Sequence, residues 1–127
     1  MKIENIKFKA KRLDNGEWVK GSFVVMKIPT LSKSALGIVA EGGATLHEVD
    51  PSTVCQFTGT KDSEGNEIWE GDIFEGESKS EIVFTKGTFA THSIDDNGKV
   101  YSYPLCYFVK EDGTVEGKVV GNKFDNK

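Results

Sequence analysis

Ile6-Lys7-Phe8-Lys9-Ala10-Lys11 is the stretch that decides the fold, because apolar and basic residues alternate along it. A period of two residues predicts a β-strand with one apolar face and one solvated, basic face. Asp14-Asn15-Gly16 follows, and an Asn-Gly pair favours a hairpin because both residues accept a positive φ. The partner strand is expected from Trp18 to about Lys27. Because its apolar residues point to both sides, we predict a central strand that is covered on both faces.

Short apolar segments continue along the rest of the chain. Turn residues separate them about every eight to twelve positions, for example at 62–66, 86–87 and 95–98. No segment keeps a helical period for ten residues, and Asp50-Pro51 predicts a single helical turn through Val54. We therefore predict a mainly β fold with little helix, a small antiparallel barrel or sandwich of short strands.

The length and composition fit an ordinary globular chain, with 127 residues, 37% hydrophobic and 28% charged. We expect a single domain over residues 1–127. The chain begins without the apolar segment of a signal peptide, and no apolar run approaches the about 20 residues of a membrane span. A cytoplasmic protein without membrane contact is expected, and Cys55 and Cys106 are expected to be free, buried thiols.

Charge is unevenly distributed along the chain. The net charge is −4, yet residues 1–33 carry eight of the 16 Lys and Arg and only three of the 20 acids. Lys7, Lys9, Lys11 and Arg12 form a basic stripe near Trp18, which can contact nucleic acid as small barrels do. Lysines also protect exposed edge strands from pairing with other chains, and the acidic net charge favours that interpretation.

Residues 64–81 are strongly acidic, with seven acids and one lysine. This segment can bind a cation or a basic partner, although a solvated loop edge is the commoner meaning. Asp72 can join Asp62, Glu67 or Glu70 in an acid/base or metal site. Turn chemistry alone explains the Gly-Asp pair, because Gly71 can take a positive φ while the Asp72 carboxylate accepts backbone N–H groups. We favour the structural interpretation.

No metal site or cofactor is predicted. His47, His92, Cys55 and Cys106 are separated by more than the short spacings of zinc-ligand pairs. For a Cys–His nucleophile pair, the sequence shows neither an acid that could orient the histidine nor an oxyanion hole at an identifiable position. No catalytic residue is therefore assigned.

Tyr101, Tyr103 and Tyr107 form an aromatic band beside Phe108. On a continuous strand the three tyrosines would share one face with Leu105. Such a band can belong to the core, or it can form a binding surface, because tyrosine is favoured at protein interfaces. Both interpretations stay open.

A longer pattern lies between residues 49 and 75, with the elements Gln56-Phe57-Thr58-Gly59, Lys61-Asp62, Gly65 and Glu70-Gly71-Asp72-Ile73. Together with Val119-Val120-Gly121-Asn122 it resembles the signature of the YopX family of bacteriophages and of prophages in Gram-positive bacteria. The resemblance implies a β-rich fold, a phage or prophage origin and a homo-oligomer, and it implies no established reaction. Six residues of the pattern are expected to have structural roles: Thr58, Gly59, Asp62, Gly65, Gly71 and Asp72.

These observations favour a non-enzymatic β domain, encoded by a phage or prophage, that binds an unidentified host or phage protein and self-associates. The tyrosine band is its expected interface. The alternative is a small-barrel nucleic-acid-binding protein that uses the basic N-terminal strand and Trp18. An acid-dependent enzyme centred on Asp62, Glu70 and Asp72 is the third and least favoured hypothesis.

Overall fold

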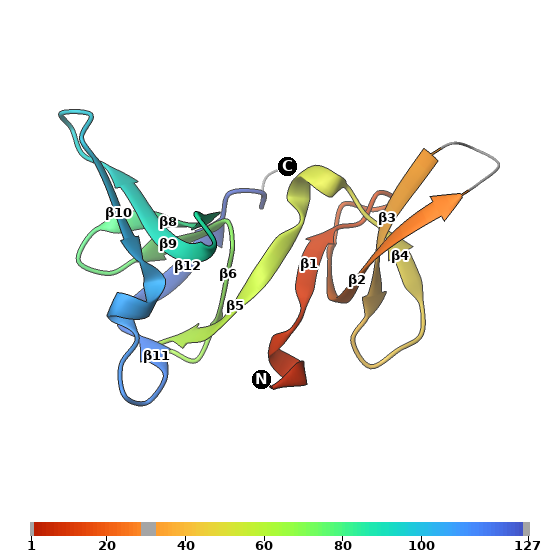
Figure 1. Ribbon diagram of the computed structural model, residues 1–127, viewed down its shortest axis with the longest axis horizontal. Helices are drawn as coiled ribbons and strands as arrows, with labels where there is room; N and C mark the ends of the chain where they lie inside the picture. The colour runs from red at the N-terminus through yellow and green to blue at the C-terminus, as the bar shows by residue number, and fades with distance from the viewer. Residues whose placement is uncertain (1, 29–32, 126–127) are drawn as a thin grey trace. The chain divides into compact units, whose positions relative to one another are not determined.

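The computed structural model describes residues 2–28 and 33–125. The structure is about 57% strand and 9% helical, and among the described residues no helix reaches seven residues. Figure 1 shows the strands and the few short helical turns between them. The prediction of a mainly β fold with little helix is confirmed. The described strands form two open sheets that are mostly antiparallel, so the closed barrel among the expected architectures is wrong. Across the described residues, no helix is long and apolar enough to cross a membrane.

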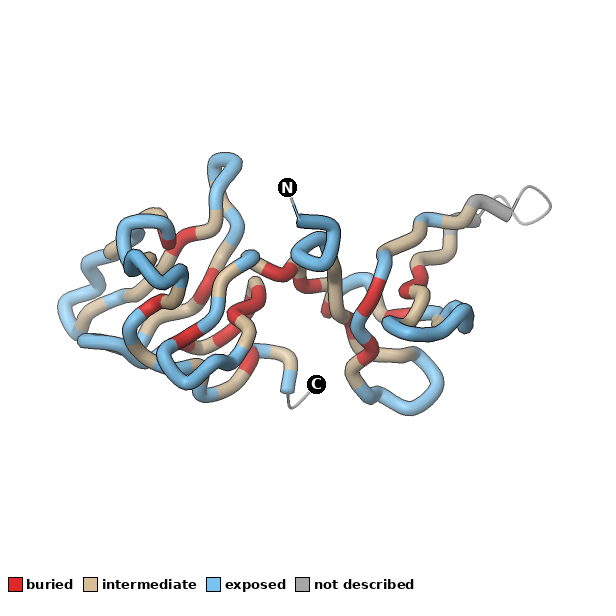
Figure 2. The backbone as a smooth tube through the Cα atoms, turned by 90° about the horizontal axis from the view of Figure 1, so that it is seen from below, coloured by how far each residue is buried: buried red, intermediate tan, exposed pale blue. Residues whose placement is uncertain are grey.

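The contacts divide the chain into two compact units, Met1–Phe57 and Thr58–Lys127. Strand β5 (Cys55–Asp62) begins in the first unit and ends in the second. Each unit buries its own apolar side chains, and Figure 2 shows these buried positions along the backbone. The expectation of a single domain stays a prediction.

In the first unit, β1 (Phe8–Lys11) pairs with β2 (Trp18–Ile28) in the predicted antiparallel hairpin. Gly16 closes the turn with a φ of 72°. The sheet continues from β2 to β3 (Lys33–Ala40) and β4 (Leu46–Glu48). On its other side β1 pairs with the start of β5.

Two short 3₁₀-helices belong to this unit, η1 (Ile3–Asn5) and η3 (Pro51–Thr53). The predicted helical turn is confirmed in η3, where the Asp50 carboxylate accepts the Ser52 N–H at 3.0 Å. The core of the unit consists of Ala10, Val19, Ile38 and Val49.

Strand β2 is central in its pairing, because β1 and β3 lie on either side of it. The expected coverage on both faces is wrong, since Val25 keeps 56% of its surface exposed. In β2, therefore, the presence of apolar residues on both faces did not predict that both faces are buried.

In the second unit, the main sheet has the order β10-β9-β8-β7-β12. Its strands are β7 (Asp72–Glu75), β8 (Lys79–Thr85), β9 (Thr88–Ile94), β10 (Val100–Pro104) and β12 (Lys118–Asn122). The end of β5 pairs with β6 (Glu67–Trp69) and, in parallel, with β11 (Thr114–Val115). The 3₁₀-helix η4 (Leu105–Phe108) follows β10.

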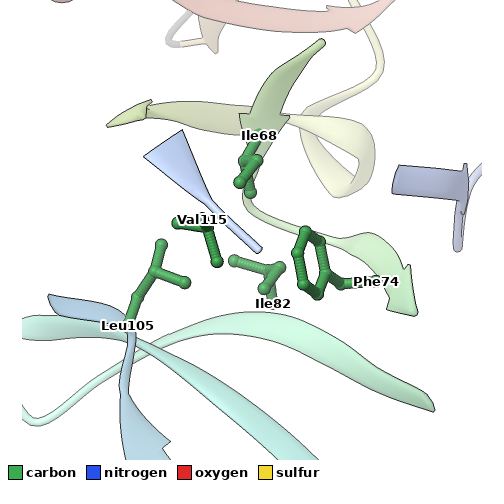
Figure 3. Packing of buried hydrophobic residues seen from close by; sticks show 5 residues of the cluster. All are labelled: Ile68, Phe74, Ile82, Leu105 and Val115. Atoms are coloured by element: carbon green, nitrogen blue, oxygen red, sulfur yellow. The ribbon is translucent and has the colours of Figure 1, made fainter. Parts of the chain in front are cut away.

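One apolar cluster holds the second unit together. Ile68, Phe74, Ile82, Leu105 and Val115 point toward one another from five different elements (Figure 3). All five are at most 4% exposed. Because these residues come from β6, β7, β8, η4 and β11, their burial joins the main sheet to the elements that cover it.

Gly117, just before β12, fits closely against Phe74. Its φ is 124°, and a Cβ there would lie 2.7 Å from the Glu75 carbonyl oxygen and 2.7 Å from the Phe74 ring. Residues other than glycine rarely adopt this backbone conformation, and neither the ring nor the carbonyl can move away without disturbing the sheet.

We expect Gly117→Ala to lower the free energy of unfolding of the second unit by about 2 kcal/mol or more, from strain and overpacking together. Fluorescence of the buried Trp69 during urea unfolding, in a Trp18→Phe background, measures this change. Gly76→Ala is the matched control, because its Cβ would meet the same ring at 3.6 Å, an ordinary contact. Equal stability of the two variants would contradict this role of Gly117.

Candidate binding pocket

The inner face of the main sheet in the second unit is only partly filled by apolar side chains. Phe74 pairs with Ser80, and Ile82 pairs with Thr91, so these four residues share one face of the sheet. Phe74 and Ile82 belong to the core, whereas small hydroxyl residues occupy the neighbouring positions, Ser80 and Thr91 together with Ser93. Where the side chains become small, an open cavity of about 800 Å³ remains, which we call the pocket.

Four aromatic rings are among the described residues that line the pocket, and one of them is Phe74 of the core. Tyr101 and Tyr103 come from β10, and Phe108 comes from η4. The Tyr103 and Phe108 rings meet edge to face, with centroids 6.3 Å apart. Tyr103 and Phe108 remain 46% and 43% exposed, so much of their apolar surface is available to a bound molecule.

The rim of the pocket is acidic. Glu75, Glu77 and Glu116 line it and are exposed, and Lys110 is the one cation among the described lining residues. In the described part of the chain, none of these three glutamates forms an ion pair. The pocket therefore combines aromatic surface with an excess of negative charge.

The pocket contains two of the three tyrosines expected at an interface. Tyr107 lies outside it and is 73% exposed. The prediction that Tyr101, Tyr103 and Tyr107 share one face is wrong, because the strand ends at Pro104 and η4 has a period of three residues. That helix buries Leu105 and turns Cys106 outward. Neither Cys106 nor Cys55 forms a disulfide; Cys106 is exposed, against the expectation, and Cys55 is buried as expected.

Several pocket residues were missed from the sequence. Ser80 and Ser93 belong to apolar strands, and only the register shows that they lie beside core positions. Two of the glutamates, Glu75 and Glu77, lie in the acidic segment 64–81, for which we favoured a solvated loop edge. The acidic segment was the available sequence signal for this site. It did not reveal the pocket, because the aromatic rings of β10 and η4 lie next to it only in the folded chain.

The basic stripe lies in the first unit, on β1. The Lys9 and Lys11 ammonium groups lie 4.6 and 5.1 Å from the centre of the Trp18 ring, and Lys7 lies 4.8 Å from that of Phe57. Arg12 instead forms two hydrogen bonds with Asp14. The interpretation of these lysines as protection for an exposed edge strand is wrong, because β1 pairs with β2 on one side and β5 on the other.

Asp62 is fully buried and accepts several hydrogen bonds. Its carboxylate accepts the backbone N–H groups of Glu64, Asn66 and Val119 at 2.8–2.9 Å, and the Asn66 side-chain amide at 3.2 Å. Burial alone would raise the pKa of Asp62, but the hydrogen bonds from Val119 and Asn66, followed by that from Glu64, hold the pKa below its ordinary value. The carboxylate thus stays ionised while it connects a turn to β12.

Asp72 is buried in a similar environment. It accepts the Trp69 N–H at 2.7 Å and the Asn122 side-chain amide at 2.9 Å. The preceding Gly71 has a φ of 87°, and its N–H bonds to the Ile82 carbonyl. These are contacts that a structural role of Asp72 requires, and the role itself stays a prediction.

The other residues of the expected structural motif lie in the same unit. The Thr58 hydroxyl donates to the Ile68 carbonyl at 2.7 Å, and Gly59 and Gly65 have positive φ values of 84° and 86°. Within residues 2–28 and 33–125, no group of three or more His, Cys, Asp and Glu side chains is placed to hold a metal ion.

Two small β-sheets and a pocket with an aromatic and acidic lining define the chain as a mainly β protein with a candidate binding site. A family model described as YopX protein matches residues 7–127. The chain belongs to the YopX family. A comparison with curated proteins gave no match.

Asp62→Asn is expected to lower the free energy of unfolding at pH 7 by about 1–3 kcal/mol, because an amide group would face backbone donors. The folded-state pKa of Asp62 is depressed, so its carboxylate stabilises the fold above the unfolded-state pKa of about 3.9 and loses this effect as the pH falls through the folded pKa. The difference from the unsubstituted protein should therefore shrink below about pH 4. Urea unfolding from pH 7 to pH 2.5 tests this, with exposed Asp96→Asn as the control. A difference that does not change with pH would contradict it.

Asp72→Asn should also lower the free energy of unfolding, by about 1–3 kcal/mol, since its amide would meet the Trp69 N–H or the Asn122 amide. The double variant Asp72→Asn/Asn122→Asp exchanges acceptor and donor, so it should recover part of the loss in a double-mutant cycle. Unchanged stability in Asp72→Asn would instead favour a catalytic carboxylate.

Proposed function

We propose that this chain is a phage- or prophage-encoded, non-enzymatic binding domain that holds a segment of a partner protein in the pocket of the second unit. Membership of the YopX family supports the phage origin. The observation that carries the binding proposal is the open, 800 Å³ pocket, in which exposed aromatic rings lie beside unpaired carboxylates. Exposed tyrosine and phenylalanine surface is characteristic of the centre of protein interfaces.

The environment of the buried acids supports a non-enzymatic function. A general acid or base needs a carboxyl group that can reach the proton it transfers. Asp62 and Asp72 are 0% and 2% exposed, and their oxygens accept hydrogen bonds from the protein itself. Neither carboxylate lines the pocket. We propose that the chain acts in the cytoplasm of the host cell, on a host or phage protein.

Nucleic-acid binding by the first unit is the second candidate. One observation favours it: Lys9 and Lys11 lie over Trp18 on one face of the sheet, a combination of cations and aromatic surface that single strands can use. This candidate needs no contribution from the pocket, so one experiment can separate the two functions.

A photo-reactive benzoylphenylalanine at position 103 should crosslink to a protein segment when the tagged chain is expressed in phage-infected or lysogenic cells. The same group at position 107, outside the pocket, should give no such adduct. Mass spectrometry after nuclease treatment identifies the attached chain. Adducts shared by both positions, or none at 103, would refute the proposal, and nuclease-sensitive retention lost in Lys9→Ala/Lys11→Ala would favour nucleic-acid binding.

A pocket-filling variant provides the matched comparison. Ser93→Phe places a ring in the pocket and should reduce the crosslink at 103 by about tenfold. Ser102→Phe is its control, because Ser102 is exposed and its neighbours Tyr101 and Tyr103 line the pocket from the opposite face of β10. Urea unfolding of both variants shows whether each one is folded.

A further inference from the structure

We propose that the pocket binds an arginine side chain carried by a basic segment of the partner protein. This inference rests on the proposed function and specifies the chemistry of its partner. The arginine would stack on one of the two rings, Tyr103 or Phe108, which lie at 88° to each other, and pair with the carboxylates of the rim, Glu75, Glu77 and Glu116.

The charge of the pocket determines the sign of the ligand. Three glutamates and one lysine line it, and no described residue forms an ion pair with those glutamates. A phosphate or carboxylate ligand would be repelled there. A neutral ligand would displace water from the carboxylates without supplying opposite charge. A cation satisfies both the carboxylates and the faces of the aromatic rings, which carry partial negative charge.

The hydroxyl groups favour arginine over lysine. Ser80 and Ser93 lie in the half-buried floor of the pocket, and in the described part of the chain their side chains form no hydrogen bond. A guanidinium group has five N–H donors in a plane, so it can donate to hydroxyls and carboxylates while its face lies on a ring. An ammonium group concentrates its donors at one point and cannot stack in this way.

The size of the pocket favours a segment of chain over an isolated cation. A volume of about 800 Å³ exceeds that of one side chain and lies within the range of pockets that hold drug-sized ligands. Because the pocket is open to solvent and its glutamates are exposed, a peptide can lie across Glu75 and Glu116 while one arginine reaches the rings.

The test uses the full chain and a fluorescein-labelled Gly-Arg-Gly-Arg-Gly peptide, with lysine and citrulline peptides of the same length. Fluorescence anisotropy at about 150 mM salt, where long-range charge effects are screened, should show saturable binding of the arginine peptide. The lysine peptide should bind about threefold more weakly or worse, and the uncharged citrulline peptide should not saturate. In amide NMR spectra, the arginine peptide should shift Ser93, Tyr103 and Gly117.

Matched charge variants distinguish binding in the pocket from nonspecific electrostatic attraction to the rest of the protein surface. The triple variant Glu75→Gln/Glu77→Gln/Glu116→Gln should lower the affinity for the arginine peptide by about tenfold or more. Glu4→Gln/Glu48→Gln/Glu111→Gln changes the net charge equally at exposed positions outside the pocket and should have less than about a twofold effect. Lys110→Gln removes the cation of the pocket and should strengthen binding, a gain that damage to the fold cannot produce.

Equal weakening by both triple variants, or equal binding of arginine and citrulline peptides, would overturn the inference. A crosslinked partner segment without arginine would refute it while leaving the proposed function intact. A missing crosslink at position 103 would refute the proposed function itself, whatever the peptides do.

Discussion

Two buried carboxylates connect segments of the second unit that lie far apart in the sequence. Asp62 accepts the N–H of Val119, 57 residues later, and Asp72 accepts the side-chain amide of Asn122, 50 residues later. A buried charge is tolerated only when hydrogen bonds replace the water it has lost. Val119 and Asn122 both belong to β12, so these hydrogen bonds depend on the position of this strand at the edge of the main sheet.

The position of β12 also shapes the pocket. Gly117 precedes this strand and lies against the Phe74 ring, so its approach sets one wall of the cavity. Strands β8 and β9 of the same sheet carry Ser80 and Ser93 where larger side chains would fill the space. An open cavity thus arises beside the core without any change in sheet pairing.

Local chemistry made several features predictable. The hairpin at Gly16, the turn at Asp50 and the positive φ of Gly71 follow from residue types whose backbone preferences act over a few positions. The pairing of strands that lie far apart in the sequence was harder to predict. That β1 is an internal strand depends on β5, which begins 44 residues after β1 ends, and alternation cannot show which strand lies alongside. For the pocket, Tyr101 and Tyr103 were found as an aromatic band, but Phe108 reached them only because η4 changes the period after Pro104.

By itself the sequence determined the secondary-structure class, the positions of the tight turns and the family, since each depends on short segments and their order. The tertiary structure decided which residues the buried aspartates contact and which polar side chains face inward. It also brought the acidic segment to the tyrosines. The physical reason is that strand register joins residues far apart in the chain, and a shift of one position would move every side chain to the opposite face.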